Sequence, residues 1–494
     1  MDVVVRQWRR PCAAVLAAVL AGGCAARLAE LPEIEPMRGA SRAPGRPWEP
    51  RTGEAPPVLP GEQAPGLPPD LAPQADRLTL AALVDAALRE SPSTRVAWQT
   101  ARAAAASYGQ ARGAYYPTVI AAAGGAYEQL RPPDGIVLFR GAYGDVGAAL
   151  DYLLLDFGGR DASVEAARQA LFAANWSQNQ AIQDVLLNVA QAYYGLVGAE
   201  AQVRAAEATL RDAETSLRAA DARLQYGAGT IADVYQARAD VAQATFVLVG
   251  ARGAVETARG VLATAVGWRA DTPFDVAAAE SPAAADVERN VEALIAAAER
   301  NRPALAAARA GVLQQQAALR QAESALWPRL NAVGAVQQQW VHKDAGGPDT
   351  QNANYLAGLQ VTAPIFEGFA LRNAVRGARA TLAATRAQLA RDEQDVIDDV
   401  WTAYYAFRTA ADQLTASRAL LASAQESYNV SLERYRLGAG DIVQLLNTLS
   451  TLAAARAALV NAETALSVSY AQLLHAIGAA DPGALAGSAP AAAE

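Results

Sequence analysis

The segment Arg223-Leu224-Gln225-Tyr226-Gly227-Ala228-Gly229 returns 211 residues later as Arg434-Tyr435-Arg436-Leu437-Gly438-Ala439-Gly440. In both copies a long Ala-rich stretch precedes the glycines and a second apolar stretch follows them. Glycine reaches positive φ at little steric cost, so paired glycines between two apolar stretches predict a tight helix-to-helix turn. The chain is therefore predicted to contain two helical hairpins of one design.

The same offset of 211 residues relates landmarks on both sides of these turns. The matches are Pro92 with Pro303, Tyr116-Pro117 with Trp327-Pro328, Asp156 with Glu367, Ala192-Tyr193-Tyr194 with Ala403-Tyr404-Tyr405, and Gly267 with Gly478. Because the offset never changes, the two halves align without gaps from about residue 78 to 267. The sequence thus predicts a tandem repeat of one structural unit.

Each unit is predicted to contain the same elements in the same order. A short helix and a second helix, which ends before a proline, lead into two strand segments. A very long helix, the glycine turn and a return helix follow. The predicted short, long and return helices are 78–90, 159–225 and 231–266 in the first unit, and 291–300, 370–436 and 442–477 in the second.

The long helix of the first unit carries an apolar heptad repeat. From Val185 to Leu224, apolar residues recur at alternating spacings of four and three. The same repeat in the second unit is less regular, because Ser417 and Ser431 occupy two of its apolar positions. A period of 3.5 residues gives a left-handed supercoil against neighbouring helices. At a rise of 1.5 Å per residue, such helices reach on the order of 100 Å.

One strand segment in each unit has an apolar face and a more polar one. In the first unit, Val146, Ala148, Leu150 and Tyr152 alternate with Asp145, Gly147, Ala149 and Asp151. In the second, Tyr355, Ala357, Leu359, Val361 and Ala363 alternate with Leu356, Gly358, Gln360 and Thr362. A strand between lipid and a water-filled lumen requires this pattern. The preceding segments, 118–129 and 330–340, alternate poorly and are assigned as strands from the repeat.

Four such strands do not satisfy a bilayer by themselves. Every backbone N–H and C=O at that depth needs a protein partner, so the sheet has to close, and about eight strands make the smallest barrel. Two chains would pool eight strands and three would pool twelve, of which only the wider barrel leaves a useful aqueous bore. The predicted fold class is an α+β membrane protein, a long helical barrel continuous with a transmembrane β-barrel, four strands coming from each protomer.

The N-terminus has the features of a secretory signal. Arg6, Arg9 and Arg10 precede an apolar run, Ala13–Leu20, that is too short to span a bilayer. The segment Leu20–Cys24 resembles a bacterial lipobox, in which Cys24 becomes the acylated first residue, although Ala21 stands where Leu is preferred. Plain cleavage at small residues is the alternative. Beyond the signal no apolar run of 18 residues predicts a spanning helix.

Charge and cysteine content exclude several classes of protein. Removal of the signal leaves 39 basic and 49 acidic residues, a net charge of −10, which argues against a nucleic-acid partner. Cys24 is then the only cysteine, so one mature chain has no disulfide and no thiolate metal site. The predicted organisation is signal peptide 1–23, lipidated Pro-rich arm 24–76, first repeat 77–267, linker 268–288, second repeat 289–478 and disordered tail 479–494.

Taken together, these motifs resemble the TolC family of outer-membrane efflux factors, in its lipoprotein branch. The resemblance covers nearly all of residues 78–478 and includes Leu155-Asp156-Phe157-Gly158-Gly159 and Pro364-Ile365-Phe366-Glu367-Gly368 after the strands. It implies a homotrimer with a twelve-stranded barrel in the outer membrane, helices reaching into the periplasm, and two partners, a periplasmic adaptor and an inner-membrane efflux pump. It also implies that the hairpin tips form the closed periplasmic entrance and the adaptor-docking site, here Tyr226, Gly227, Gly229, Tyr435, Gly438 and Gly440.

The resemblance further implies acidic rings just past the tips. Asp233 fits that position in the first repeat, but its counterpart is Gln444, and Asn447 stands where another carboxylate is common, so a second ring is in doubt. We expect Asp233, with Asp441, to supply the negative field of a gate. The alternative is that Asp233 only caps the return helix. Arg223 and Arg434 are candidates for salt bridges between closed tips, or favourable charges at helix C-termini.

No catalytic or cofactor-binding constellation is found in the sequence. His342 and His475 are isolated, and the paired glycines do not form a phosphate-binding loop. We therefore expect neither an enzyme nor a cofactor. Two other functions remain open, a periplasmic adaptor and a structural coiled-coil lipoprotein, but the first would have one hairpin between β-rich domains and the second would lack strand pairs.

Overall fold

A computed structural model describes residues 66–69, 71–75, 77–130, 139–277, 290–344 and 348–480. They belong to one unit that begins at Ala64. The predicted signal peptide, Cys24, most of the Pro-rich arm, the end of the predicted linker and residues 481–494 lie outside the described residues.

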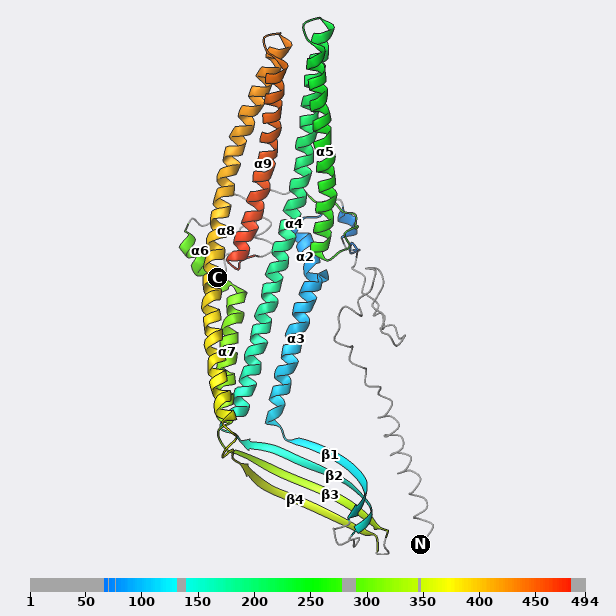
Figure 1. The fold of residues 1–494 in the computed structure, drawn as a ribbon, viewed down its shortest axis with the longest axis vertical. Helices are drawn as coiled ribbons and strands as arrows, with labels where there is room; N and C mark the ends of the chain where they lie inside the picture. The colour runs from blue at the N-terminus through cyan, green and yellow to red at the C-terminus, as the bar shows by residue number, and fades with distance from the viewer. Residues whose placement is uncertain are drawn as a thin grey trace. The chain divides into compact units, whose positions relative to one another are not determined.

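The two repeats contain the same α-helices and strands in the same order, and the first also has two 3-10 turns (Figure 1). The first comprises the 3-10 turn η1 (Ala72–Gln74), α2 (Leu80–Glu90), α3 (Pro92–Arg112), η2 (Gly113–Tyr115), β1 (Thr118–Leu130), β2 (Phe139–Leu155), α4 (Gly159–Gln225) and α5 (Ile231–Val266). The second comprises α6 (Val291–Asn301), α7 (Pro303–Ser324), β3 (Arg329–Lys343), β4 (Thr350–Thr362), α8 (Ala370–Arg436) and α9 (Ile442–Ala476). The order predicted from the repeat is confirmed.

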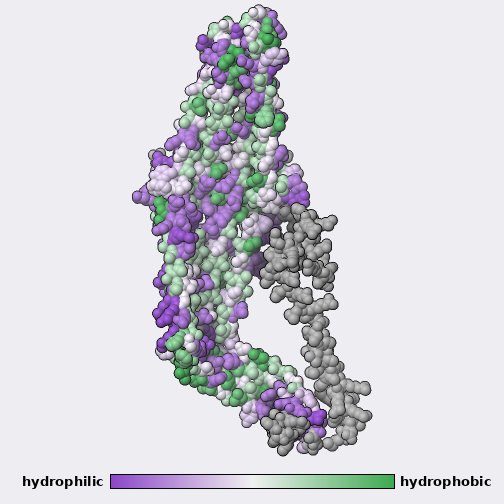
Figure 2. All heavy atoms as spheres, in the orientation of Figure 1, coloured by the Kyte–Doolittle hydropathy of each residue, from purple (hydrophilic) through white to green (hydrophobic). Residues whose placement is uncertain are grey.

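The four strands form one antiparallel sheet in the order β1-β2-β3-β4. The register of the sheet shows whether the apolar faces predicted for separate strands coincide, because residues directly opposite each other point to the same face. Ala148 lies opposite Val336, and Val336 lies opposite Tyr355. The two apolar sets predicted from separate strands therefore share one face of the sheet, while Asp145, Gln339 and Asn352 share the other. Figure 2 shows hydrophobic residues gathered over the sheet near the helices and hydrophilic ones towards its loop end.

Neighbouring helices form a layer that changes composition along its length. Next to the sheet the order is α3, α4, α7 and α8, and towards the hairpin tips it is α5, α4, α9 and α8 (Figure 1). Towards the tips, small and aliphatic side chains such as Ala213, Ala237, Leu445 and Leu452 form the core between the hairpins. The chain therefore presents α3 and α5 at one edge of the layer and α8 at the other.

One sequence-based expectation needs correction. Helix α9 has an 18-residue window with a mean hydropathy of 1.3, so by length and composition it could cross a membrane, contrary to the prediction of no such segment. Its apolar residues instead pack against α4 and α8. The first residues of the predicted linker are also part of the core, since Trp268 is buried and Val276 pairs with Leu78 in a parallel bridge.

Candidate channel entrance

Each hairpin tip is shaped by two glycines with different roles. Gly227 and Gly438 have positive φ, 71° and 82°, as predicted for a tight turn. Gly229 and Gly440 do not have positive φ, and a side chain at either position would be crowded. A Cβ on Gly229 would lie 3.1 Å from the Arg223 Cβ, and one on Gly440 would lie 3.3 Å from the Tyr435 backbone nitrogen. The prediction that all tip glycines serve positive φ was therefore half right.

The Arg223 guanidinium connects the two tips. It donates hydrogen bonds to the backbone oxygens of Tyr435 at 3.0 Å and Gly440 at 3.2 Å, and to that of Ala228 in its own turn at 2.8 Å. It also lies 4.5 Å from the centre of the Tyr435 ring, a cation–π distance. Its partners within the chain are carbonyl oxygens and a ring, which fits the alternative of a cation placed at a helix C-terminus.

Arg434, the counterpart of Arg223, repeats only the contact with its own turn. Its guanidinium donates to the backbone oxygen of Ala439, in its own turn, at 3.3 Å. The two arginines that the repeat makes equivalent therefore have unequal roles within one protomer.

Asp233 and Asp441 both cap return helices. The Thr230 hydroxyl and the Asp233 carboxylate form a reciprocal capping box at the start of α5, while the Asp441 carboxylate accepts from the Gln444 backbone N–H at 2.7 Å. Asp233 also accepts a hydrogen bond from the Tyr435 hydroxyl at 3.4 Å. Burial, and then the nearby Asp233 carboxylate, raise the pKa of Tyr435. The capping alternative is thus realised in the structure, and a capping carboxylate still contributes negative charge.

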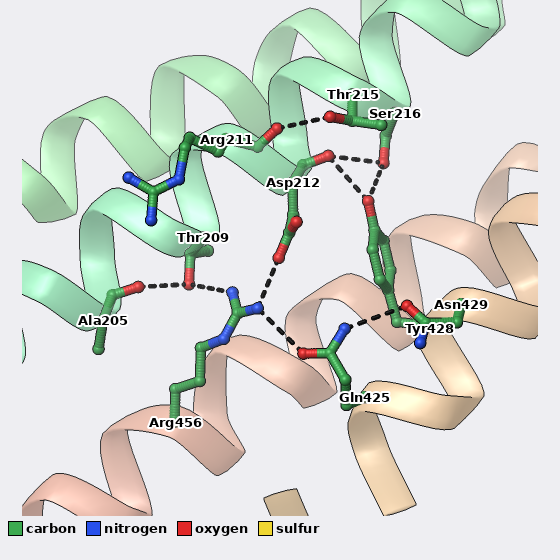
Figure 3. A network of polar contacts seen from close by, with 10 residues as sticks. All are labelled: Ala205, Thr209, Arg211, Asp212, Thr215, Ser216, Gln425, Tyr428, Asn429 and Arg456. Carbon is green, nitrogen blue, oxygen red and sulfur yellow. Dashed lines mark hydrogen bonds and ion pairs between the residues drawn. The ribbon is translucent and has the colours of Figure 1, made fainter. Parts of the chain in front are cut away.

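A second polar connection lies farther from the tips (Figure 3). Arg456 of α9 forms an ion pair with Asp212 of α4 at 2.7 Å and donates to Gln425 of α8 at 3.1 Å. Beside it, the buried Tyr428 hydroxyl donates to the Asp212 backbone oxygen at 2.9 Å and lies 3.2 Å from the Ser216 hydroxyl. Sequence analysis missed this cluster, although a lone arginine within the apolar α9 sequence was a signal for it.

Within the described residues, no group of three or more His, Cys, Asp or Glu side chains could hold a metal ion. The described chain instead offers a sheet with one apolar face, large exposed residues on that face such as Leu359, and two outer strands, β1 and β4, each bonded on one side. Long helical hairpins continue from it. These features define an envelope channel.

The chain belongs to the outer membrane efflux protein family, which matches it over residues 83–268 and 294–479. The resemblance to TolC-type channels is thereby confirmed. The protein is an outer-membrane channel of a tripartite efflux system, and the adaptor and structural-lipoprotein alternatives are not favoured. Its family and fold are those of channel proteins.

Known proteins similar to the chain cover most of its length. The outer-membrane channel OprN matches with a TM-score of 0.70 and 19% identity, over 86% of this chain and 99% of that one. The outer membrane protein VceC from Vibrio cholerae matches with a TM-score of 0.68 and 22% identity, over 81% and 96%. Protein CyaE of Bordetella pertussis is 28% identical over 405 residues, 81% of this chain and 85% of that one.

Proposed function

We propose that three copies of the chain form one channel, in which twelve strands close a barrel in the outer membrane and the hairpins continue it as a tube into the periplasm. An inner-membrane pump and a periplasmic adaptor deliver the substrate, and the channel conducts it passively. The number three follows from the bore, because eight strands from two chains leave an interior filled by side chains.

The observation that carries this proposal is the register at the sheet's free edges. Suppose that neighbouring copies are related in the same way as the two repeats within one chain. The pair formed by Ala148 in β2 and Val336 in β3 then corresponds, 211 residues away on each side, to a pair formed by Leu359 in β4 and Gly125 in β1 of the next copy. Both of these residues lie on the apolar face of the sheet. A register wrong by one residue would place one of them on the polar face. A pairing of β4 with β1 of the next copy in this register would therefore continue the apolar face from one copy to the next.

Cross-linking tests the barrel directly. Leu359→Cys combined with Gly125→Cys should give a covalent trimer on a non-reducing gel after oxidation of outer-membrane fractions. Leu359→Cys combined with Ala126→Cys, on the opposite face, is the matched control and should give none. A ladder that stops at dimer, or equal yields from both pairs, would refute the three-copy barrel.

We propose that Cys24 carries the lipid anchor in the outer membrane. The basic n-region, the short apolar run and the small residues before Cys24 support it. Labelled palmitate should be incorporated into the wild type and not into Cys24→Ala. Incorporation that persists in this variant would contradict the anchor.

We also propose that the tips form the closed entrance, with Asp233 and Asp441 supplying negative charge and Arg223 holding the two turns together. The tip glycines Gly227, Gly229, Gly438 and Gly440, with Tyr226, are then the surface that meets the adaptor. The sequence also predicted Tyr435 for this surface, but its side chain is fully buried and makes contacts between the two tips instead. Support comes from the exposure of Tyr226 and from the contacts of Arg223 with the second turn. Tyr226→Cys should cross-link to an adaptor hairpin in whole cells, and a Cys at exposed Phe246, away from the tip, should not.

A further inference from the structure

The turn that joins β4 to α8, where the sheet meets the helices, exposes large apolar side chains (Figure 1). Ile365, Phe366 and Phe369 are 97%, 73% and 60% exposed, and the two rings contact each other edge to face with 5.5 Å between their centres. Phe369 has a positive φ of 65°, which is a strained conformation for a bulky side chain. An exposed ring that is kept at a strained position points to a partner that covers it.

The equivalent turn of the first repeat shows how much of this surface a neighbouring strand covers. Leu154 and Leu155 are the counterparts of Ile365 and Phe366, and they follow β2 where it pairs with β3. They are still 41% and 48% exposed. In the proposed barrel, β1 of the next copy lies beside β4 as β3 lies beside β2. We therefore expect the turn after β4 to stay exposed in the assembled channel.

The first two turns of α8 carry two exposed arginines in an arrangement that is unfavourable within the chain. Arg372 lies in the first turn, where a helix favours acidic groups and where α4 has Asp161. Arg376 follows four residues later, so two like charges lie one above the other on the same helix face, a spacing that destabilises a helix. An anionic partner at this face would offset both effects.

The chain itself supplies little to neutralise these two charges. Arg376 donates a hydrogen bond to the uncharged Asn373 side chain at 3.3 Å. For the Arg372 guanidinium, no hydrogen bond or ion pair is found among the described residues. Both guanidinium groups are therefore available to a ligand outside the chain.

The first repeat is an internal comparison for this charge pattern. There the Tyr115 hydroxyl donates to Asp161 at 2.7 Å, whereas the second repeat has Leu326 and Arg372 at the same two positions. Residues 152–171 contain two arginines and three acidic residues, and residues 363–382 contain three arginines and one glutamate. The net charge is thus −1 in the first repeat and +2 in the second. The backbone plan is shared, so the positive charge belongs to the second junction alone.

We propose that Ile365, Phe366, Phe369, Arg372 and Arg376 form a binding surface for an anionic phospholipid of the periplasmic leaflet of the outer membrane. The apolar side chains enter the acyl-chain boundary, and the arginines bind the headgroup phosphate. The surface continues the apolar face of the sheet, on which Leu359 and Val361 are 69% and 68% exposed. This inference rests on the proposed function, which places the helices on the periplasmic side.

Two lipids with the same acyl chains test the surface. The purified channel in neutral maltoside detergent is titrated with dioleoylphosphatidylglycerol, which is anionic, or with dioleoylphosphatidylcholine, which has no net charge. Native mass spectrometry measures the fraction of protein that carries bound lipid. Each arginine near an anionic surface strengthens binding by a factor of about five. We therefore expect Arg372→Gln/Arg376→Gln to weaken phosphatidylglycerol binding by about 25-fold and to leave phosphatidylcholine binding unchanged.

The matched control is Arg408→Gln/Arg418→Gln, which removes two exposed arginines of the same helix roughly 50 Å farther from the turn. It should keep the preference of the wild type for phosphatidylglycerol. Phe369→Gly removes the ring and relieves the backbone strain, so the fold is kept. That variant should bind both lipids more weakly and preserve the preference between them.

Equal binding of the two lipids by the wild type would leave the surface to a protein partner and overturn the inference. A wild-type preference in Arg372→Gln/Arg376→Gln would overturn it as well. The same spectra count the copies of the chain in each particle. A particle with a number of copies other than three contradicts the proposed assembly, whereas its lipid preference still decides whether this surface binds anionic phospholipid.

Discussion

Replacing Arg456 by Met tests how strongly the two hairpins of a protomer are coupled. The variant keeps much of the apolar stem of the side chain but removes the charge that faces Asp212 at 2.7 Å. It also removes the donor to Gln425. The Asp212 carboxylate is then left between helices without its counterion.

The magnitude follows from how far the pair is removed from water. An exposed ion pair contributes about 0–1 kcal/mol, and removing one partner of a fully buried pair costs about 3–5 kcal/mol. The Arg456 and Asp212 side chains are 16% and 25% exposed, so the pair lies between these limits. We expect Arg456→Met to lower the free energy of unfolding by about 2–3 kcal/mol per chain.

Guanidinium unfolding of the detergent-solubilised protein, followed by far-UV circular dichroism at fixed protein concentration, measures this loss. Arg252→Met is the matched control, because Arg252 pairs with Glu207 at 3.1 Å but is 60% exposed, and it should lose less than about 1 kcal/mol. Asp212→Leu/Arg456→Met removes both charges and should recover to within about 1 kcal/mol of the wild type. A single variant as stable as the wild type, or a double variant no better than the single, would refute the coupling.

Three further predictions concern the tips and the helical core. Asp233→Ala should reduce cation selectivity and divalent-cation block in single-channel recordings, whereas unchanged selectivity would leave Asp233 as a helix cap alone. Gly229→Ala should destabilise the tip by about 1–3 kcal/mol in thermal unfolding because the new Cβ would crowd Arg223 and Leu224, and Gly250→Ala, which meets open space, should not. Burial raises the pKa of Tyr194 to about 12, so its neutral form stabilises the fold fully below pH 10, and up to about 3 kcal/mol is lost as pH rises from 10 through 12. Tyr194→Phe should show a smaller loss over that range in pH-dependent unfolding, and an identical pH profile would contradict the assignment.

Much of the fold could be predicted from sequence because the pattern of each helix and strand occurs twice, 211 residues apart. The boundaries of α4 and α8 agree with the predicted 159–225 and 370–436. The poorly alternating segments became β1 and β3, as their positions in the repeat required, and the sheet register aligned the apolar faces. Local pattern and fixed spacing are sufficient for such features, since neither depends on a distant partner.

The contacts between hairpins could not be predicted in the same way. Arg223 finds its acceptors 212 and 217 residues away, and those acceptors are backbone carbonyls, which every residue has. The Asp212–Arg456 pair depends on the rotation of α4 and α9 about their own axes. The steric role of Gly229 depends on how closely its turn returns to Arg223. Tertiary geometry decides each of these, and side-chain type alone leaves many alternatives.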